Sequence, residues 1–144
     1  VPHLDVFERC LEAIDHPVAY NGDITRRSDF TRLAERFPKV NRWMIGRGAL
    51  INPFLAASIK SEKDEFPDPI GTYQRFHDAL FAAHREVFSG PAHLLDRMKG
   101  FWFYFSQAFE APRKFLKEIR GIRCPERYMA RVARFFDAEA VWRS

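Results

Sequence analysis

The first 60 residues alternate between helical and strand-like spacing of their apolar side chains. Leu4, Phe7 and Leu11 recur on one helical face, whereas the run from Val18 to Tyr20 has the short, continuous character of a buried strand. The pattern predicts a helix at 4–15, a strand at 17–21, a helix at 28–37, a strand at 40–45 and a short helix at 53–59. Helices and strands that alternate through short links are typical of successive βα units in a parallel sheet.

From residue 70 onward the apolar spacing is helical throughout. Four amphipathic stripes are present, within residues 73–87, 94–109, 115–122 and 129–136. Ser89-Gly90-Pro91 ends the first stripe, and Pro125 begins the last. Short turns between four amphipathic helices predict a compact bundle. The aromatic residues of 101–109 are too dense for one helix face, so most should be core and one or two exposed.

Between these two parts lies one convincing linker, residues 61–69, which is polar, charged and interrupted twice by proline. The sequence therefore predicts an α/β segment at 1–60, a linker at 61–69 and an all-α domain at 70–144. No internal repeat or low-complexity tract interrupts either part.

Charge is unevenly distributed although the net charge of the 144-residue chain is only +4. Residues 61–96 hold three Lys or Arg against seven Asp or Glu, whereas residues 113–134 hold eight against two. Six of the cations recur at i, i+4 and i+7 opposite the apolar stripes of two successive helices: Arg113, Lys117 and Arg120, then Arg127, Arg131 and Arg134. Lys114 and Arg123 flank the first set. A solvated face and a phosphate-binding face both fit this pattern, and two successive helices of one sign put the two interpretations on an equal footing.

Composition excludes several other classes. With 47% hydrophobic residues the chain can bury a core, and it has no apolar run long enough to cross a membrane. Two cysteines far apart suggest a reducing compartment, and we expect a cytoplasmic location. The five histidines show no metal-ligand spacing with cysteine or acidic residues, so no metal is expected, and His77 and His84 are interpreted as structural.

Two glycine-containing turns carry the candidate chemistry. Each follows a predicted strand and leads into a helix: Asn21-Gly22-Asp23 and Gly46-Arg47-Gly48. Glycine lets backbone amides approach an anion, and the arginine fork suits phosphate. Two such strand ends in succession predict the phosphate site found after the last two strands of a (β/α)8 barrel.

The two turns resemble those of the tRNA-dihydrouridine synthases, flavoenzymes that reduce specific uridines in tRNA. In that family an Asn-Gly-Asp turn and a Met-Ile-Gly-Arg-Gly turn hold the phosphate of FMN. The match from Met44 to Leu50, with Asn52-Pro53 behind it, is the most specific part. Residues 98–109 and 113–122 look like that family's helical tRNA-binding domain.

This resemblance implies the last two βα units of a TIM barrel followed by a helical tRNA-binding domain, with FMN as cofactor, NADPH as reductant and tRNA as substrate. The family's catalytic cysteine lies on an earlier barrel loop. Cys124-Pro125 is not its equivalent, because the proline is expected to open a helix. We therefore expect a C-terminal piece that is inactive alone and open to self-association through its unpaired strands.

Two alternatives remain at the level of sequence. One is a non-catalytic RNA-binding helical module that retains a barrel remnant, and the other is part of a different FMN-binding barrel oxidoreductase. Flavin content distinguishes the first alternative from a synthase, and the basic helical tail is unexplained by the second.

Overall fold

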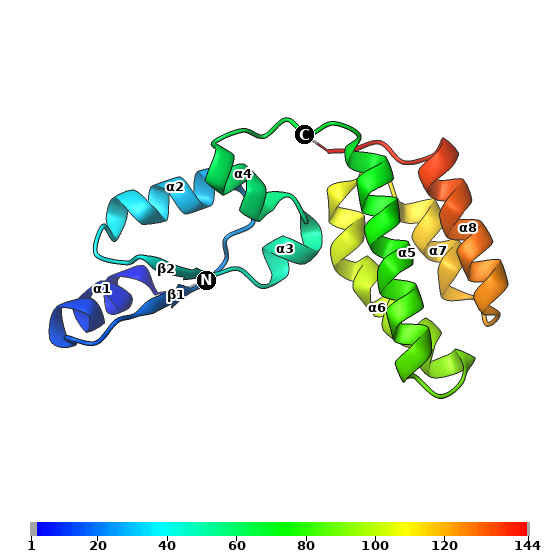
Figure 1. The fold of residues 1–144 in the computed structure, drawn as a ribbon, viewed down its shortest axis with the longest axis horizontal. Helices are drawn as coiled ribbons and strands as arrows, with labels where there is room; N and C mark the ends of the chain where they lie inside the picture. Colours follow the sequence, from blue (N-terminus) through cyan, green and yellow to red (C-terminus); the bar gives the residue numbers. More distant parts are fainter. Residues whose placement is uncertain (1–2, 144) are drawn as a thin grey trace. The chain divides into compact units, whose positions relative to one another are not determined.

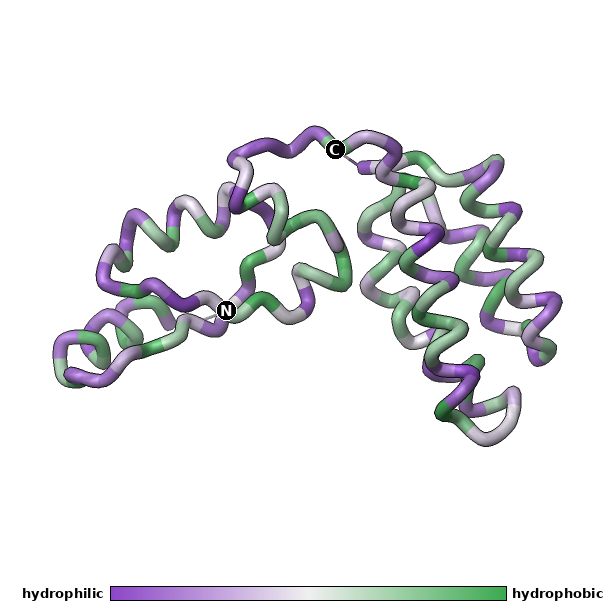
Figure 2. Tube along the Cα trace, viewed as in Figure 1, coloured by the Kyte–Doolittle hydropathy of each residue, from purple (hydrophilic) through white to green (hydrophobic). Residues whose placement is uncertain are grey.

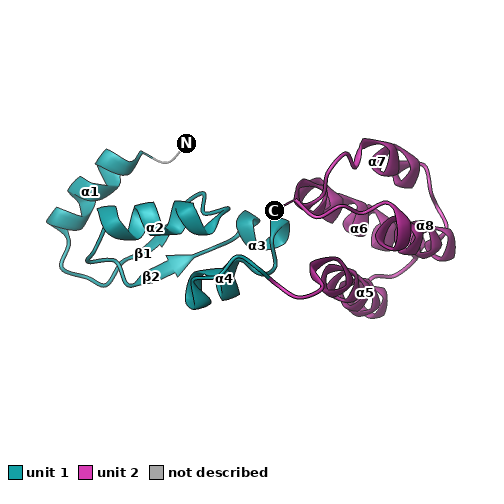
Figure 3. Ribbon diagram, turned by 90° about the horizontal axis from the view of Figure 1, so that it is seen from above, with its two compact units in different colours: residues 1–65 teal, residues 66–144 magenta. Residues whose placement is uncertain are grey.

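The computed structural model describes residues 3–143 and divides the chain into two compact units (Figure 1). Unit 1 comprises residues 1–65 and unit 2 residues 66–144, so the division lies inside the segment expected as a linker (Figure 3). Each unit has its own hydrophobic core.

Unit 1 contains two short parallel strands and four helices. The elements are α1 (Leu4–Ala13), β1 (Ala19–Asn21), α2 (Arg27–Arg36), β2 (Arg42–Met44), α3 (Arg47–Ile51) and α4 (Leu55–Ser61). The strands pair with Tyr20 opposite Trp43, which confirms the expected parallel β–α–β connection. Helix α3 has no counterpart among the expected elements, and both strands are shorter than expected. The eight-stranded barrel stays a prediction, because one pair of strands does not define it.

Aromatic side chains hold unit 1 together on one face of this sheet. Tyr20 is buried from β1, and Phe37 follows α2. Phe7 of α1 meets both rings edge-on, with centroid distances of 5.1 Å, a favourable geometry for aromatic pairs. Arg36 also pairs with Asp5 and Glu8, which ties α2 to α1.

The opposite face of the sheet is exposed. In register, Ala19 lies beside Arg42 and Asn21 beside Met44, and all four are exposed. Met44 retains 59% of its accessible surface. Because successive strand residues point to opposite faces, the helices of unit 1 cover the Tyr20 face alone.

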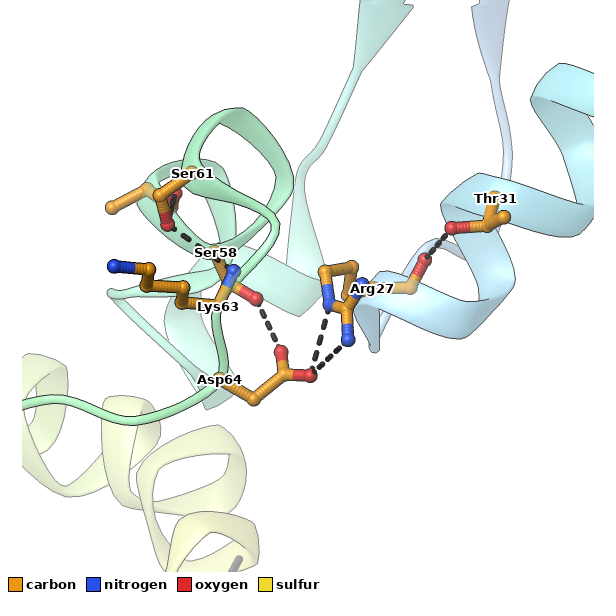
Figure 4. A network of polar contacts seen from close by, with 7 residues as sticks. Arg27, Thr31, Ser58, Ser61, Lys63 and Asp64 are labelled. Carbon is orange, nitrogen blue, oxygen red and sulfur yellow. Dashed lines mark hydrogen bonds and ion pairs between the residues drawn. The ribbon is translucent and has the colours of Figure 1, made fainter.

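Asp64 fastens the end of unit 1 to two helices (Figure 4). It accepts hydrogen bonds from Arg27 Nε at 2.9 Å and Nη2 at 2.7 Å, and from the hydroxyl of Ser58. These bonds lower the pKa of Asp64, chiefly through Arg27. The first residues of the expected linker are therefore part of a folded unit.

Unit 2 is the expected bundle. Its helices are α5 (Pro69–Val87), α6 (Pro91–Phe105), the 3-10 turn η1 (Ser106–Ala108), α7 (Arg113–Arg120) and α8 (Pro125–Ala138). Helices α5, α6 and α8 each begin with proline, where the missing N–H costs nothing. Gly90, at φ 93°, makes the turn before α6 in a conformation that favours glycine.

The core of unit 2 is aromatic. Hydrophobic and hydrophilic residues alternate along each of its helices (Figure 2). Trp102, Phe105 and Phe109 are fully buried, while Phe103 is exposed, as expected for this dense run. Phe115 of α7 stacks on Phe135 of α8 at 4.2 Å and meets Trp102 at 4.5 Å. Helix α7 thus packs on α6 and α8 (Figure 3).

A polar triad lies inside this aromatic core. Trp102 Nε1 donates to the hydroxyl of Tyr128 at 2.8 Å, and that oxygen lies 3.0 Å from His77 Nε2. Since the Asp78 carboxylate can only accept, Nδ1 of the neutral imidazole donates to it at 3.0 Å, and Nε2 then accepts the hydrogen of the Tyr128 hydroxyl. His77 is thereby structural, as expected, and burial lowers its pKa.

Unit 2 should lose stability below neutral pH because of His77. The pKa of His77 is lower in the folded than in the unfolded chain. Its contribution to the free energy of unfolding is therefore fully present above about pH 6.5 and is lost as the pH falls below that value. The slope for one proton is at most about 1.4 kcal/mol per pH unit. Urea unfolding between pH 7.5 and 5 measures it; His77→Gln should flatten the slope, and the exposed His93→Gln should not. Equal slopes in both variants would contradict this role.

Candidate functional site

The two glycine-containing turns meet at the same edge of the unit 1 sheet. Asn21 is the last residue of β1, and Gly46 precedes α3 just beyond β2. Parallel pairing places both carboxyl ends together. Arg47 Nη2 forms an ion pair with Asp23 Oδ1, so residues 24 positions apart are in contact.

This ion pair is accessible to solvent. The side chains of Arg47 and Asp23 keep 64% and 50% of their accessible surface. A guanidinium carries five N–H donors, and one carboxylate contact engages part of that capacity. An anion that reaches Arg47 therefore meets a partly neutralised cation and must share it with Asp23.

The three glycines of the two turns differ in whether their surroundings leave room for a side chain. A Cβ at Gly48 would collide with the backbone carbonyl oxygen of Ile24, and one at Gly22 would collide with the ring of Tyr20. Both are needed for packing of unit 1. A Cβ at Gly46 would find nothing within 4 Å. Gly46 thus borders open space at the start of α3, where the first helical N–H groups lack intrahelical acceptors.

Asn52, which follows the second motif, has a local structural role. Its Oδ1 accepts the backbone N–H of Phe54 at 2.9 Å, which shapes the short connection from α3 to α4. Leu55 then enters the core of unit 1. The Asn-Pro part of the motif therefore positions α3 and has no direct contact with the Asp23–Arg47 pair among the contacts of residues 3–143.

The second candidate surface lies on α7, α8 and the short connection between them in unit 2. The cations of this surface that are exposed to solvent are Arg113, Lys114, Lys117, Arg120, Arg123, Arg127 and Arg134. Arg134 lies 3.7 Å from Glu139. The other six have no ion pair with the part of the chain that the structure describes. Opposite them, Phe115 and Ile119 of α7 are buried.

Arg131 differs from these seven cations. Its side chain is only 13% exposed, with Nε donating to Glu118 at 2.6 Å and Nη2 to Glu139 at 2.8 Å. Its guanidinium also lies 4.9 Å above the ring of Phe115. The hydrogen bond from Arg131 lowers the pKa of Glu118. Arg131 therefore joins α7 to α8 within unit 2, unlike the phosphate-facing position expected from its spacing.

The sequence contained a signal for this role. Arg131 lies three residues after Tyr128 and four before Phe135, both buried, so it borders the core stripe of α8.

Cys124 precedes Pro125, the first residue of α8, and its thiol donates to Glu126. Within residues 3–143 no group of three His, Cys, Asp or Glu is placed to hold a metal ion, and no helix is long and apolar enough to span a membrane.

Comparison with known families identifies the chain. The family model for dihydrouridine synthase matches residues 8–137, which include most of both units. The chain therefore belongs to the dihydrouridine synthase family. Comparison with individual curated proteins gives no match. Members of this family are FMN-dependent oxidoreductases that act on tRNA.

Removing the Arg131 side chain should destabilise unit 2 by about 1–2 kcal/mol. Arg131→Met loses two charge-assisted hydrogen bonds, while Glu118 and Glu139 can turn toward water. The matched control is Arg127→Met, an exposed change expected to cost within about 0.5 kcal/mol. Urea unfolding followed by far-UV circular dichroism measures both. Equal midpoints for the two variants would assign Arg131 to the surface.

Proposed function

We propose that this chain is the C-terminal part of an FMN-dependent tRNA-dihydrouridine synthase, which reduces uridine to 5,6-dihydrouridine in tRNA. Residues 1–60 correspond to the last two βα units of the barrel, and residues 70–144 to the tRNA-binding domain. One observation carries the proposal: the Asp23–Arg47 ion pair joins the two family motifs at one sheet edge.

The residues at this edge fit a phosphate group. Gly46 leaves open space before α3, Gly48 allows α3 to approach the end of β1, and Arg47 supplies the cation. With Asn21, Gly22 and Asp23 of the first turn, these residues would hold the phosphate of FMN. When bound, FMN supplies hydride transfer to the uracil ring, with NADPH as the reductant.

The role proposed for unit 2 is to bind the phosphate backbone of tRNA. Four of the seven arginines of unit 1 pair with carboxylates, among them Arg27 with Asp64 and Arg36 with Glu8. The exposed cations of α7 and α8 are mostly without such partners. Cations held apart from carboxylates on two adjacent helices favour a phosphate ligand over a merely hydrated face. The proposed surface comprises the seven exposed cations and excludes Arg131.

Arg47→Ala should weaken FMN binding to the whole enzyme by about ten- to a hundredfold, the effect of losing a hydrogen bond to a charged group. The residual flavin after dialysis, measured by absorbance, reports the affinity. Arg42→Ala, an exposed arginine of β2 outside the two turns, is the matched control and should retain FMN. Flavin retention by Arg47→Ala equal to that of the native enzyme would mean that Arg47 serves only to pair with Asp23.

Charge reversal on α7 should weaken tRNA binding and leave folding intact. Lys117→Glu with Arg120→Glu removes two exposed cations, so log affinity should depend less steeply on log salt, by roughly 0.7–0.9 per lost phosphate contact. Filter binding across a salt series provides both values. Arg26→Glu with Arg32→Glu in unit 1 is the control. Equal weakening by the control pair would show that charge anywhere on the chain suffices.

A further inference from the structure

Phe103 is an exception to the burial pattern of unit 2. It retains 70% of its accessible surface, although Trp102 before it and Phe105 after it are fully buried. Its ring meets that of Tyr104 edge-on at 5.1 Å, a contact that orients the ring while leaving most of it in solvent. A large apolar ring held in this way on a helix is a candidate contact for a flat, apolar ligand group.

Lys99 shows which flank of α6 carries Phe103. Its ammonium donates to the backbone carbonyl of Arg120 at 3.2 Å and to that of Ile122 at 2.5 Å. Residues four apart lie on the same side of a helix. Phe103, one turn after Lys99, therefore lies on the flank of α6 that faces α7.

The corresponding flank of α7 is basic. Glu118 points toward α8, where it pairs with Arg131. Leu116 is about 160° away around the helix by the 100° step per residue, so it lies on the α6 side. Arg113 and Arg120, three before and four after Leu116, share that flank and are exposed. By these helical positions, Phe103 and the two exposed arginines lie on the facing flanks of α6 and α7.

We propose that Phe103 stacks on an unpaired base of the bound RNA, while Arg113 and Arg120 bind the adjoining phosphates. The inference rests on the proposed RNA-binding function of unit 2. An aromatic face beside unpaired cations matches a nucleotide in both parts, base and phosphate. A base inside a duplex cannot offer its face to Phe103. The seam therefore selects RNA with an unstacked nucleotide, as in the loops of tRNA, beyond what charge alone selects.

The test uses the full chain and two RNA probes, a tRNA transcript and a blunt RNA duplex. Phe103→Leu keeps an apolar side chain and removes the ring; it should bind tRNA roughly tenfold more weakly, as for the loss of one base stack. Its affinity for the duplex and its salt dependence should equal those of the native chain. Phe103→Trp should bind both probes as the native chain does. Val87→Ala, an exposed apolar change on α5, is the matched control.

Three results would overturn the stacking role. Native tRNA affinity in Phe103→Leu, with weakened binding in Lys117→Glu/Arg120→Glu, would remove the stack and leave the RNA surface standing. Equal loss on tRNA and duplex would show that Phe103 does not select unpaired bases. A thermal midpoint lowered by Phe103→Leu and unchanged by Val87→Ala would mean that Phe103 packs against protein. If charge reversal also leaves tRNA binding unchanged, the proposed function of unit 2 fails with it.

Discussion

The candidate phosphate site depends on one close approach of backbone to backbone. The chain after β1 passes so near α3 that a side chain at residue 48 would collide with the carbonyl of Ile24. Glycine at this position lets the first turn of α3 lie against the end of β1. Only then do Arg47 and Asp23, from separate turns, come into contact. The Asp23–Arg47 ion pair is therefore a consequence of this close backbone packing.

In unit 2 Arg131 has a structural role, whereas the other cations of α7 and α8 are exposed to solvent. Arg131 forms ion pairs with Glu118 and Glu139 and lies over the ring of Phe115, so it fixes α7 against α8. The remaining cations of the two helices point away from the stripes that form the core. Because the contacts of Arg131 fix α7 against α8, the spacing of the exposed cations is set by two rigid helices. A regular array of that kind matches a repeating phosphate chain better than mobile side chains on loops do.

Much of the fold was predictable because its elements are amphipathic. The four stripes of unit 2 correspond to α5, α6, α7 and α8, since each helix buries one face. The short helix α3 was missed because five residues are too few to show a period. The role of Arg131 was missed because spacing places a residue on a face and says nothing of its partners. The contact between Asp23 and Arg47 depends on strand register, which the sequence alone specifies only weakly.

The hydroxyl of Tyr128 makes the buried polar groups of unit 2 dependent on its last helix. Its partners, Trp102 and His77, lie 26 and 51 residues earlier in the chain. Without α8 the indole N–H and the imidazole would lose the Tyr128 hydroxyl, and each would need water or remain an unpaired polar group in an aromatic core. A nick or deletion in α8 would affect the whole bundle rather than fray its edge.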